Sequence, residues 1–91
     1  MSSINITVVG AITDIRPLFS FISLPILTVY PETGGKREFA LDIAGTKTEP
    51  LAIGDHCVVS AANMTIRHDL HGQLVVVLTV FYINRMYHVE A

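Results

Sequence analysis

The feature that most constrains the fold is a nearly continuous apolar run, Leu74 to Ile83. Its β-branched, aromatic and leucine residues favour a strand over a helix, and both faces of such a strand need cover. A polar segment with Asp and Gly, residues 68–73, precedes the run, and a mixed stretch, His56 to His68, comes before it. This order predicts a long β-hairpin that turns at residues 68–73.

The first arm of this hairpin shows the alternation expected of a half-buried strand. Side chains two residues apart point to the same face of a strand, so apolar and polar residues separate onto opposite faces. The apolar face would carry Val58, Met64 and Ile66, and the polar face Asn63, Thr65 and Arg67.

The start of the chain predicts a strongly curved strand over residues 4–16. Apolar and polar residues alternate up to Gly10, where a bulge or sharp coil would let the strand bend between two sheets. Ile12 and Ile15 are three residues apart, which indicates a second irregularity. The strand is expected to stop at Pro17.

An apolar loop is predicted for residues 17–25, between two prolines. Loops are usually polar, so a loop with this composition should be covered by something. A partner or a second copy of the chain is the expected cover; folding back onto the domain and stacking against bases are the alternatives. The apolar residues of this segment are Leu18, Phe19, Phe21, Ile22 and Leu24.

A second hairpin is predicted from residues 26–32 and 36–44, closed by a three-residue loop with two glycines. This register pairs Tyr30 with Glu38 and Val29 with Phe39. It places Leu27, Val29, Phe39, Leu41 and Ile43 on the core face, and Thr28, Tyr30, Glu38, Ala40 and Asp42 on the outer face.

The segment that follows, residues 45–54, is too short for a full helix. Thr48 as N-cap, Pro50 in the first turn and Gly54 at the end would suit one helical turn. The whole pattern predicts an all-β fold of residues 1–91 as a single domain. It would be a five-stranded OB-fold-like barrel with a short helical turn between strands three and four. A small SH3-like barrel is the alternative.

Composition adds an expectation about assembly. Hydrophobic residues make up 51% of the chain and charged residues 15%, less than the roughly 25% that is usual. One small core hides only part of this apolar surface, so a homo-oligomer, most simply a dimer, or a permanent partner is expected; burial in a single tight barrel is the alternative. The last strand adds to this expectation, because both of its faces are apolar, with Val77 and Phe81 on the face that a barrel leaves outside.

Composition also indicates where the protein is located. A single cysteine, Cys57, excludes an internal disulfide framework and favours a reducing compartment. No apolar run approaches the ~20 residues of a membrane span, and the N-terminus lacks a charged signal-peptide start. An intracellular protein, cytoplasmic or nucleoid-associated, is expected.

Several segments together resemble bacterial single-stranded-DNA-binding proteins. Asn5 to Gly10 followed by Thr13 to Arg16 is similar to their opening strand, and Glu38 to Gly45 to their third strand, which ends in Gly. Ile53 to Ser60 is similar to their entry into strand four, and Gly72 with the apolar run to their last hairpin. The resemblance covers roughly residues 4–86 and implies an OB-fold that binds single-stranded nucleic acid. Small phage single-strand binders and the primosomal protein PriB are similar in size and plan.

The chain also departs from this family. The family stacks bases on Trp and Phe, whereas this chain has no Trp, and Ala44 stands where a stacking aromatic would be plausible. An acidic partner-recruiting tail is not expected, and the connecting helix is expected to be reduced to a turn. These differences favour a PriB-like or otherwise divergent OB-fold protein.

Single-strand binding needs cations for phosphates and exposed rings for base stacking. Tyr30 is the aromatic residue on the outer face, although Glu38 and Asp42 on that face would repel phosphates. The net charge of −2 gives no global attraction to nucleic acid, so binding would depend on a local patch. The expected binding residues are Arg16, Tyr30, Lys36, Arg37, Lys47, Asn63, Arg67 and Arg85.

Other chemistry is not expected. Residues 68–71, His-Asp-Leu-His, offer part of a metal site at most and are better explained as a polar turn. No nucleophile–base spacing, paired-carboxylate motif or phosphate-cradling loop is present, so we expect no enzyme, no cofactor and no metal.

Two hypotheses from different classes remain. The first is an oligomeric protein that binds single-stranded DNA, or RNA, without sequence specificity in replication or repair, with replication proteins as further partners. The second is an OB-fold protein-interaction subunit with little nucleic-acid binding of its own. Its interface would contain Leu18, Phe19, Phe21, Ile22, Leu24, Val77 and Phe81.

Overall fold

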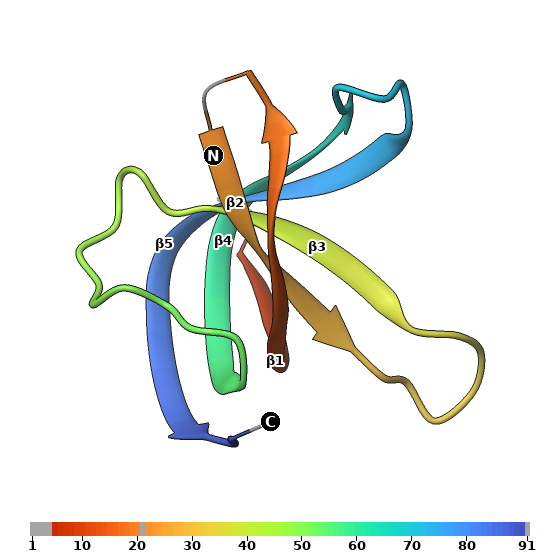
Figure 1. The fold of residues 1–91 in the computed structure, drawn as a ribbon. Coiled ribbons are helices and arrows are strands. Elements are labelled where there is room, and N and C mark those ends of the chain that lie inside the picture. The colour runs from red at the N-terminus through yellow and green to blue at the C-terminus, as the bar shows by residue number, and fades with distance from the viewer. Residues whose placement is uncertain (1–4, 21, 91) are drawn as a thin grey trace.

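The computed structural model describes residues 5–20 and 22–90, and within them it contains five β-strands and no helix. One sheet closes on itself in the order β1-β2-β3-β5-β4 (Figure 1). Neighbouring strands are antiparallel except β3 and β5, which run parallel. The predicted all-β, five-stranded class is confirmed. The strands are β1 (Ile6–Phe19), β2 (Ile22–Val29), β3 (Arg37–Asp42), β4 (Asp55–His68) and β5 (Leu74–His88).

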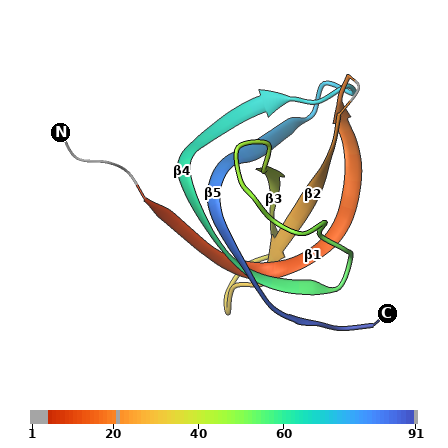
Figure 2. The same cartoon turned by 90° about the vertical axis from the view of Figure 1, so that its left-hand side faces the viewer.

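β1 belongs to both sides of the ring because it bends in its middle (Figure 2). Its residues 6–11 pair with β4, and the part from Ala11 onward pairs with β2. At the bend, a Cβ added to Gly10 would lie 2.5 Å from the carbonyl oxygen of Thr28, so the close approach of β1 to β2 requires glycine. A register shift between Ile12 and Asp14 confirms the predicted second irregularity.

The interpretation of residues 17–25 as a loop is wrong. β1 continues through Pro17 to Phe19, and β2 already begins at Ile22. Phe19 and Ile22 are partners, so the segment is the closed end of a β-hairpin. Pro17 is tolerated inside the strand because a register shift between Arg16 and Phe19 interrupts the ladder there.

Buried apolar side chains form two clusters on opposite faces of β2, β3 and β5. Consecutive residues on a strand point to opposite faces, and Ile26, Ala40 and Val77 alternate in this way with Leu27, Leu41 and Leu78. The main cluster fills the ring: Ile12, Leu27, Leu41, Cys57, Val59, Ala61, Leu78 and Val80. The second cluster contains Leu18, Leu24, Ile26, Ala40 and Val77, with Phe19 and Val75 packed against it.

The second cluster corrects the prediction for the β2–β3 hairpin. Thr28 pairs with Glu38, two residues away from the predicted register, and residues 30–36 connect the strands instead of a three-residue loop. A shift of two residues leaves the same side chains on the core face, but Thr28 and Ala40 on the other face are buried rather than exposed. Ala40 is buried because the β1–β2 hairpin end brings Leu18 and Leu24 over this face, and Thr28 shares a hydrogen bond of 2.6 Å with the hydroxyl of Thr13.

The long β4–β5 hairpin is confirmed, with pairing from Asp55–His88 to His68–Leu74. Strict alternation along β4 is wrong, because register shifts on either side of Ala61 reverse its faces. Val58 therefore does not share the face of Met64 and Ile66. The core side chains of β4 are Cys57, Val59 and Ala61, and the strand is exposed from residue 62 to residue 68.

The predicted helical turn is absent, because residues 43–54 form an irregular connection with turns only. This connection is fixed to the strands by single contacts. The hydroxyl of Thr46 donates to the carbonyl of Val80, and the backbone N–H of Gly54 donates to Ile12 O at 2.8 Å. Backbone carbonyls on the strands thus accept from the connection, in place of hydrogen bonds that a helical turn would have made within itself.

Candidate functional site

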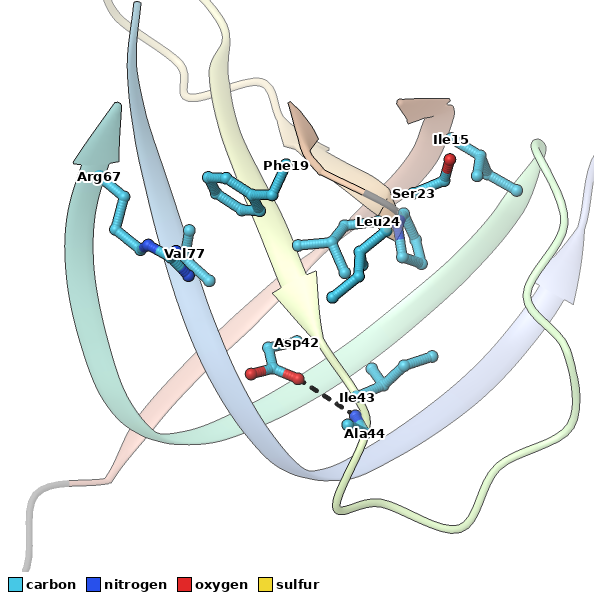
Figure 3. Close-up of a pocket in the computed structure, with 11 residues that line it drawn as sticks. Ile15, Phe19, Ser23, Leu24, Asp42, Ile43, Ala44, Arg67 and Val77 are labelled. Atoms are coloured by element: carbon cyan, nitrogen blue, oxygen red, sulfur yellow. Dashed lines mark hydrogen bonds between the residues drawn. The ribbon is translucent and has the colours of Figure 1, made fainter. Parts of the chain in front are cut away.

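A cleft of about 360 Å³ lies between the closed end of the β1–β2 hairpin, the end of β3 and the β4–β5 hairpin (Figure 3). We call it the hairpin cleft. The tips of the two hairpins lie close together, since the backbone N–H of Leu70 donates to Leu18 O at 2.9 Å. The cleft is lined by Ile15, Phe19, Ile22, Ser23, Leu24, Pro25, Asp42, Ile43, Ala44, Arg67 and Val77.

One side of the cleft is formed by Phe19 and Arg67. The guanidinium carbon of Arg67 lies 4.2 Å from the centroid of the Phe19 ring, the geometry of a cation–π contact. Phe19 is held by the second apolar cluster, and Arg67 lies on the exposed part of β4. Neither residue rests on an irregular loop, so both positions are defined by strand pairing.

A carboxylate lies at the opposite side of the cleft. Leu41 points into the ring, so alternation places Asp42 on the face of Ala40 and of the cleft. One carboxylate oxygen, Oδ1, accepts the backbone N–H of Ala44 at 3.2 Å (Figure 3). Within residues 5–20 and 22–90, Asp42 takes part in no ion pair.

Arg16, one of the expected binding residues, is neutralised by carboxylates. Its Nε lies 2.8 Å from Asp14 Oδ2 and its Nη2 lies 2.9 Å from Glu38 Oε2, and Lys36 Nζ approaches the same Glu38 oxygen at 4.0 Å. The hydrogen bond to Glu38, followed by that to Asp14, raises the pKa of Arg16, and the bond from Arg16 lowers the pKa of Asp14. Little of this positive charge is left for phosphates.

Arg85 lies far along β5 from the hairpin tip and is also paired. Its guanidinium lies 3.0 Å from Glu49 and 3.7 Å from the buried Asp55. Asp55 also accepts the N–H of Ala52 at 2.9 Å and contacts His88 Nδ1 at 2.7 Å. Burial of Asp55 raises its pKa, but these hydrogen bonds and the nearby guanidinium of Arg85 outweigh it, so the pKa is lowered overall.

The remaining expected binding residues lie apart from the cleft. Tyr30, Lys36 and Arg37 surround the β2–β3 connection, which Figure 1 shows on the side of the molecule away from the hairpin tips. Lys47 belongs to the irregular connection, and Asn63 is exposed on β4. The structure therefore brings one expected cation, Arg67, into the cleft and disperses the others.

The residues of the expected interface also divide into two groups. Leu18, Leu24 and Val77 are buried within the chain, and Phe19 is half-buried. Ile22 and Phe81 are exposed, and Phe21 lies outside the described residues.

The sequence did not predict the cleft, because its walls come from a segment that was interpreted as a loop. Phe19 and Arg67 were each singled out, but nothing in their spacing showed that they meet. Asp42 was expected on the outer face of its strand, and its alternation with Leu41 was the available signal for its place in the cleft.

The polar turn at residues 68–73 is held by its own aspartate. Asp69 Oδ1 accepts the N–H groups of Gln73 at 2.9 Å and His71 at 2.8 Å, and these bonds, that to Gln73 first, lower the pKa of the carboxyl. Residues 5–20 and 22–90 contain no group of three or more His, Cys, Asp or Glu arranged to hold a metal ion. Cys57 is buried in the main cluster, and burial raises the pKa of its thiol.

We compared the chain with known proteins to find which of them share this fold. No protein-family model matches the chain, and no curated protein sequence matches it significantly. Among solved structures, the mitochondrial single-stranded DNA binding protein Rim1 of S. cerevisiae superposes with a TM-score of 0.59 at 14% identity, covering 97% of this chain and 99% of that one. The fold is that of the single-stranded DNA-binding proteins. The small single-stranded DNA-binding protein of Streptomyces coelicolor agrees, with a TM-score of 0.53, 20% identity and coverage of 93% and 95%.

The predicted resemblance to OB-fold single-stranded-DNA-binding proteins is thus confirmed at the level of the fold. As for membranes, the described residues contain no helix that is long and apolar enough to span one.

Proposed function

We propose that this protein binds single-stranded DNA in the hairpin cleft without strict sequence specificity, and that it acts in replication or repair as a binding protein and not as an enzyme. The observation that best supports this proposal is the position of the cleft. It opens between the β1–β2 and β4–β5 hairpins beside β2 and β3, where OB-folds bind oligonucleotides. Similarity to two single-stranded DNA-binding proteins supports the same partner, which implies an intracellular location.

The contents of the cleft suit a nucleotide. Phe19 offers a ring for stacking and Arg67 a cation for a phosphate. A second hollow continues the cleft past the same two residues and Ile22, lined also by Ser20, His68, Asp69 and Leu70. The two hollows together provide a path for a short strand over the Phe19–Arg67 pair.

Arg37 and Lys47 are proposed as secondary phosphate contacts. Within the described residues neither forms an ion pair, in contrast to Arg16, Lys36 and Arg85. Tyr30 and Asn63 remain predicted contacts of a strand that extends beyond the cleft.

The proposal is tested by fluorescence anisotropy with a labelled single-stranded DNA oligomer over a range of salt concentrations. Affinity should fall with salt, and Arg67→Ala should lower the slope of log K against log salt by about 0.7, the value for one phosphate of a single strand. Lys36→Ala removes the same charge outside the cleft, at a side chain already beside Glu38, and should leave the slope nearly unchanged. A matched RNA oligomer and a duplex complete the set; equal binding of duplex and single strand would contradict the proposal.

We also propose that the protein self-associates. The β4–β5 hairpin projects beyond the ring, so the face that continues the core, beyond Leu78, is left uncovered by residues 5–20 and 22–90. Met64, Ile66 and Leu74 on this face are 51%, 65% and 68% exposed. A second copy is the proposed occupant, since an apolar face on a chain with so few charges is the usual basis of a homo-oligomer.

A protein-interaction subunit is the alternative function, and the observation that favours it is the apolar lining of the cleft. Ile22, Pro25 and Ile43 would suit an apolar peptide side chain as well as a base. Absence of oligonucleotide binding at low salt would favour this alternative.

A further inference from the structure

Asp42 is an unexpected neighbour for a nucleic acid. A carboxylate repels phosphates, and Asp42 has no cation beside it within the described residues. Glu38, the other acidic residue on this face of β3, differs because it is paired with Arg16 at 2.9 Å. The uncompensated carboxylate therefore lies inside the cleft, and the compensated one lies outside it.

This charge arrangement fixes how a nucleotide can lie in the cleft. Arg67 is the cation in the lining and Asp42 is the anion, and they come from β4 and from the end of β3 (Figure 3). The phosphate is drawn to the Arg67 side and kept away from Asp42. The edge of the base must then face the carboxylate, because the remainder of the lining is apolar apart from Ser23.

The hydrogen-bonding capacity of Asp42 decides which base edge is accepted. An ionised carboxylate only accepts hydrogen bonds, and it has about four acceptor positions. The structure fills one of them, with the N–H of Ala44 at 3.2 Å on Oδ1. In Figure 3 the second oxygen is turned away from Ala44, so it can receive a donor from a ligand.

We infer that the hairpin cleft prefers bases with an exocyclic amino group, and that Asp42 is the residue that recognises this group. Cytosine, adenine and guanine present N4, N6 and N2 amino donors, and an acidic side chain is the usual acceptor for the cytosine amino group. Uracil and thymine have no amino group: they present at C4 a carbonyl oxygen, which the carboxylate repels, and beside it a single N3–H donor. This inference rests on the proposed function and adds a compositional preference to it.

The test compares two ligands that differ in little else. Oligo-dC and oligo-dU of equal length, at pH 8 and low salt, differ in the amino or carbonyl group at C4 and in the N3 proton. The unmodified protein should bind oligo-dC about fivefold to tenfold more tightly, the lower part of the range for one base-edge contact. An amide can offer either a donor or an acceptor, so Asp42→Asn should bring the ratio close to one.

Two controls separate recognition from general charge and from misfolding. Glu32→Gln removes one negative charge from the β2–β3 connection, outside the cleft, and should keep the oligo-dC preference. Oligo-dC with dimethylated N4 lacks the amino donors and should lose its advantage on the unmodified protein, which tests the contact without any variant.

The outcomes are distinct. Equal binding of oligo-dC and oligo-dU, tighter oligo-dU, an unchanged ratio in Asp42→Asn, or an undiminished affinity for the dimethylated oligomer would each overturn the inference and leave the proposed function intact. Failure of the protein to bind any of the oligomers would reject the proposed function and the inference with it.

Discussion

Arg67 occupies the Phe19 ring that the proposed function assigns to a base. A base can stack there after the guanidinium moves aside, or it can stack on the guanidinium itself. A cation–π contact at an exposed site contributes about 0.5–1 kcal/mol, whereas stacking of a base on an aromatic ring contributes about 1–3 kcal/mol. Replacing the cation–π contact by base stacking is therefore favourable, and the displaced Arg67 would remain beside the phosphate of the same nucleotide.

Phe19→Leu tests the ring directly. Leucine keeps an apolar side chain against the second cluster, so the protein should stay folded, but it removes the stacking surface. Affinity for a single-stranded oligomer should fall by about 1–3 kcal/mol, fivefold or more, in a fluorescence anisotropy titration. Phe81→Leu changes an exposed ring outside the cleft and is the matched control. Equal losses in both variants would remove Phe19 from the binding site.

Gly10→Ala tests the bend of β1. The added Cβ would lie 2.5 Å from the backbone oxygen of Thr28, which cannot move without shifting β2, so the free energy of unfolding should fall by about 1–3 kcal/mol. Gly35 in the β2–β3 connection has no atom within 4 Å of an added Cβ, so Gly35→Ala should be close to neutral. Urea unfolding of both variants measures the difference; similar stabilities would contradict the close approach.

At the scale of elements, the sequence predicted best where alternation and turn residues agreed. The β4–β5 hairpin carries an apolar arm and a turn built by Asp69, and the bulge after Ile12 followed from apolar spacing. The prediction failed at Pro17, because proline was taken to end a strand, whereas an interrupted ladder accommodates it. It failed again along β4, since a shift of register at Ala61 leaves no mark in the sequence.

The candidate site was predictable only in part, for a related reason. Single residues with stacking or charged side chains can be recognised, and Phe19 and Arg67 were. Their meeting depends on how two hairpins curl over the same face of the sheet, which strand patterns do not specify. Ion pairing is equally hidden, so Arg16 and Arg85 looked available in the sequence although carboxylates neutralise them.

The end of β5 is held by Asp55, and this attachment should depend on pH. The folded protein lowers the pKa of Asp55, so its contribution to stability is present above the usual value of about 3.9 and is lost as the pH falls through the folded value. At neutral pH, Asp55→Asn should reduce the free energy of unfolding by about 1.5–3 kcal/mol, the range for hydrogen bonds to a charged group.

The difference between the two proteins should shrink as the pH is lowered from about 5 towards the folded pKa of Asp55, because the carboxylate of the unfolded chain takes up its proton first and that of the folded protein only at lower pH. Glu90→Gln removes the exposed carboxylate 3.7 Å from His88 and should change stability by less than ~0.5 kcal/mol. Urea unfolding at a series of pH values provides the measurement. A pH-independent gap between Asp55→Asn and the native protein would show that Asp55 acts through packing alone.

For the whole molecule, the main prediction is self-association through the projecting hairpin. Sedimentation equilibrium at tens of micromolar should give a dimer or a larger symmetric oligomer. Ile66→Ser combined with Leu74→Ser should give a folded monomer, because both side chains are exposed within one chain. A native protein that sediments as a monomer of 10.0 kDa would refute the prediction.

The strand order of the ring also has a consequence in time. β5 lies between β3 and β4, and β1 pairs with β4 about fifty residues away, for example Val8 with Val59. Adjacent hairpins can form as the chain leaves the ribosome, but no ring can close until residues 74–88 have been synthesised. Long-range closure of this kind slows folding to the millisecond-to-second range. Until then the strand edges and apolar faces of the nascent chain stay open, and the cell must protect them from premature association.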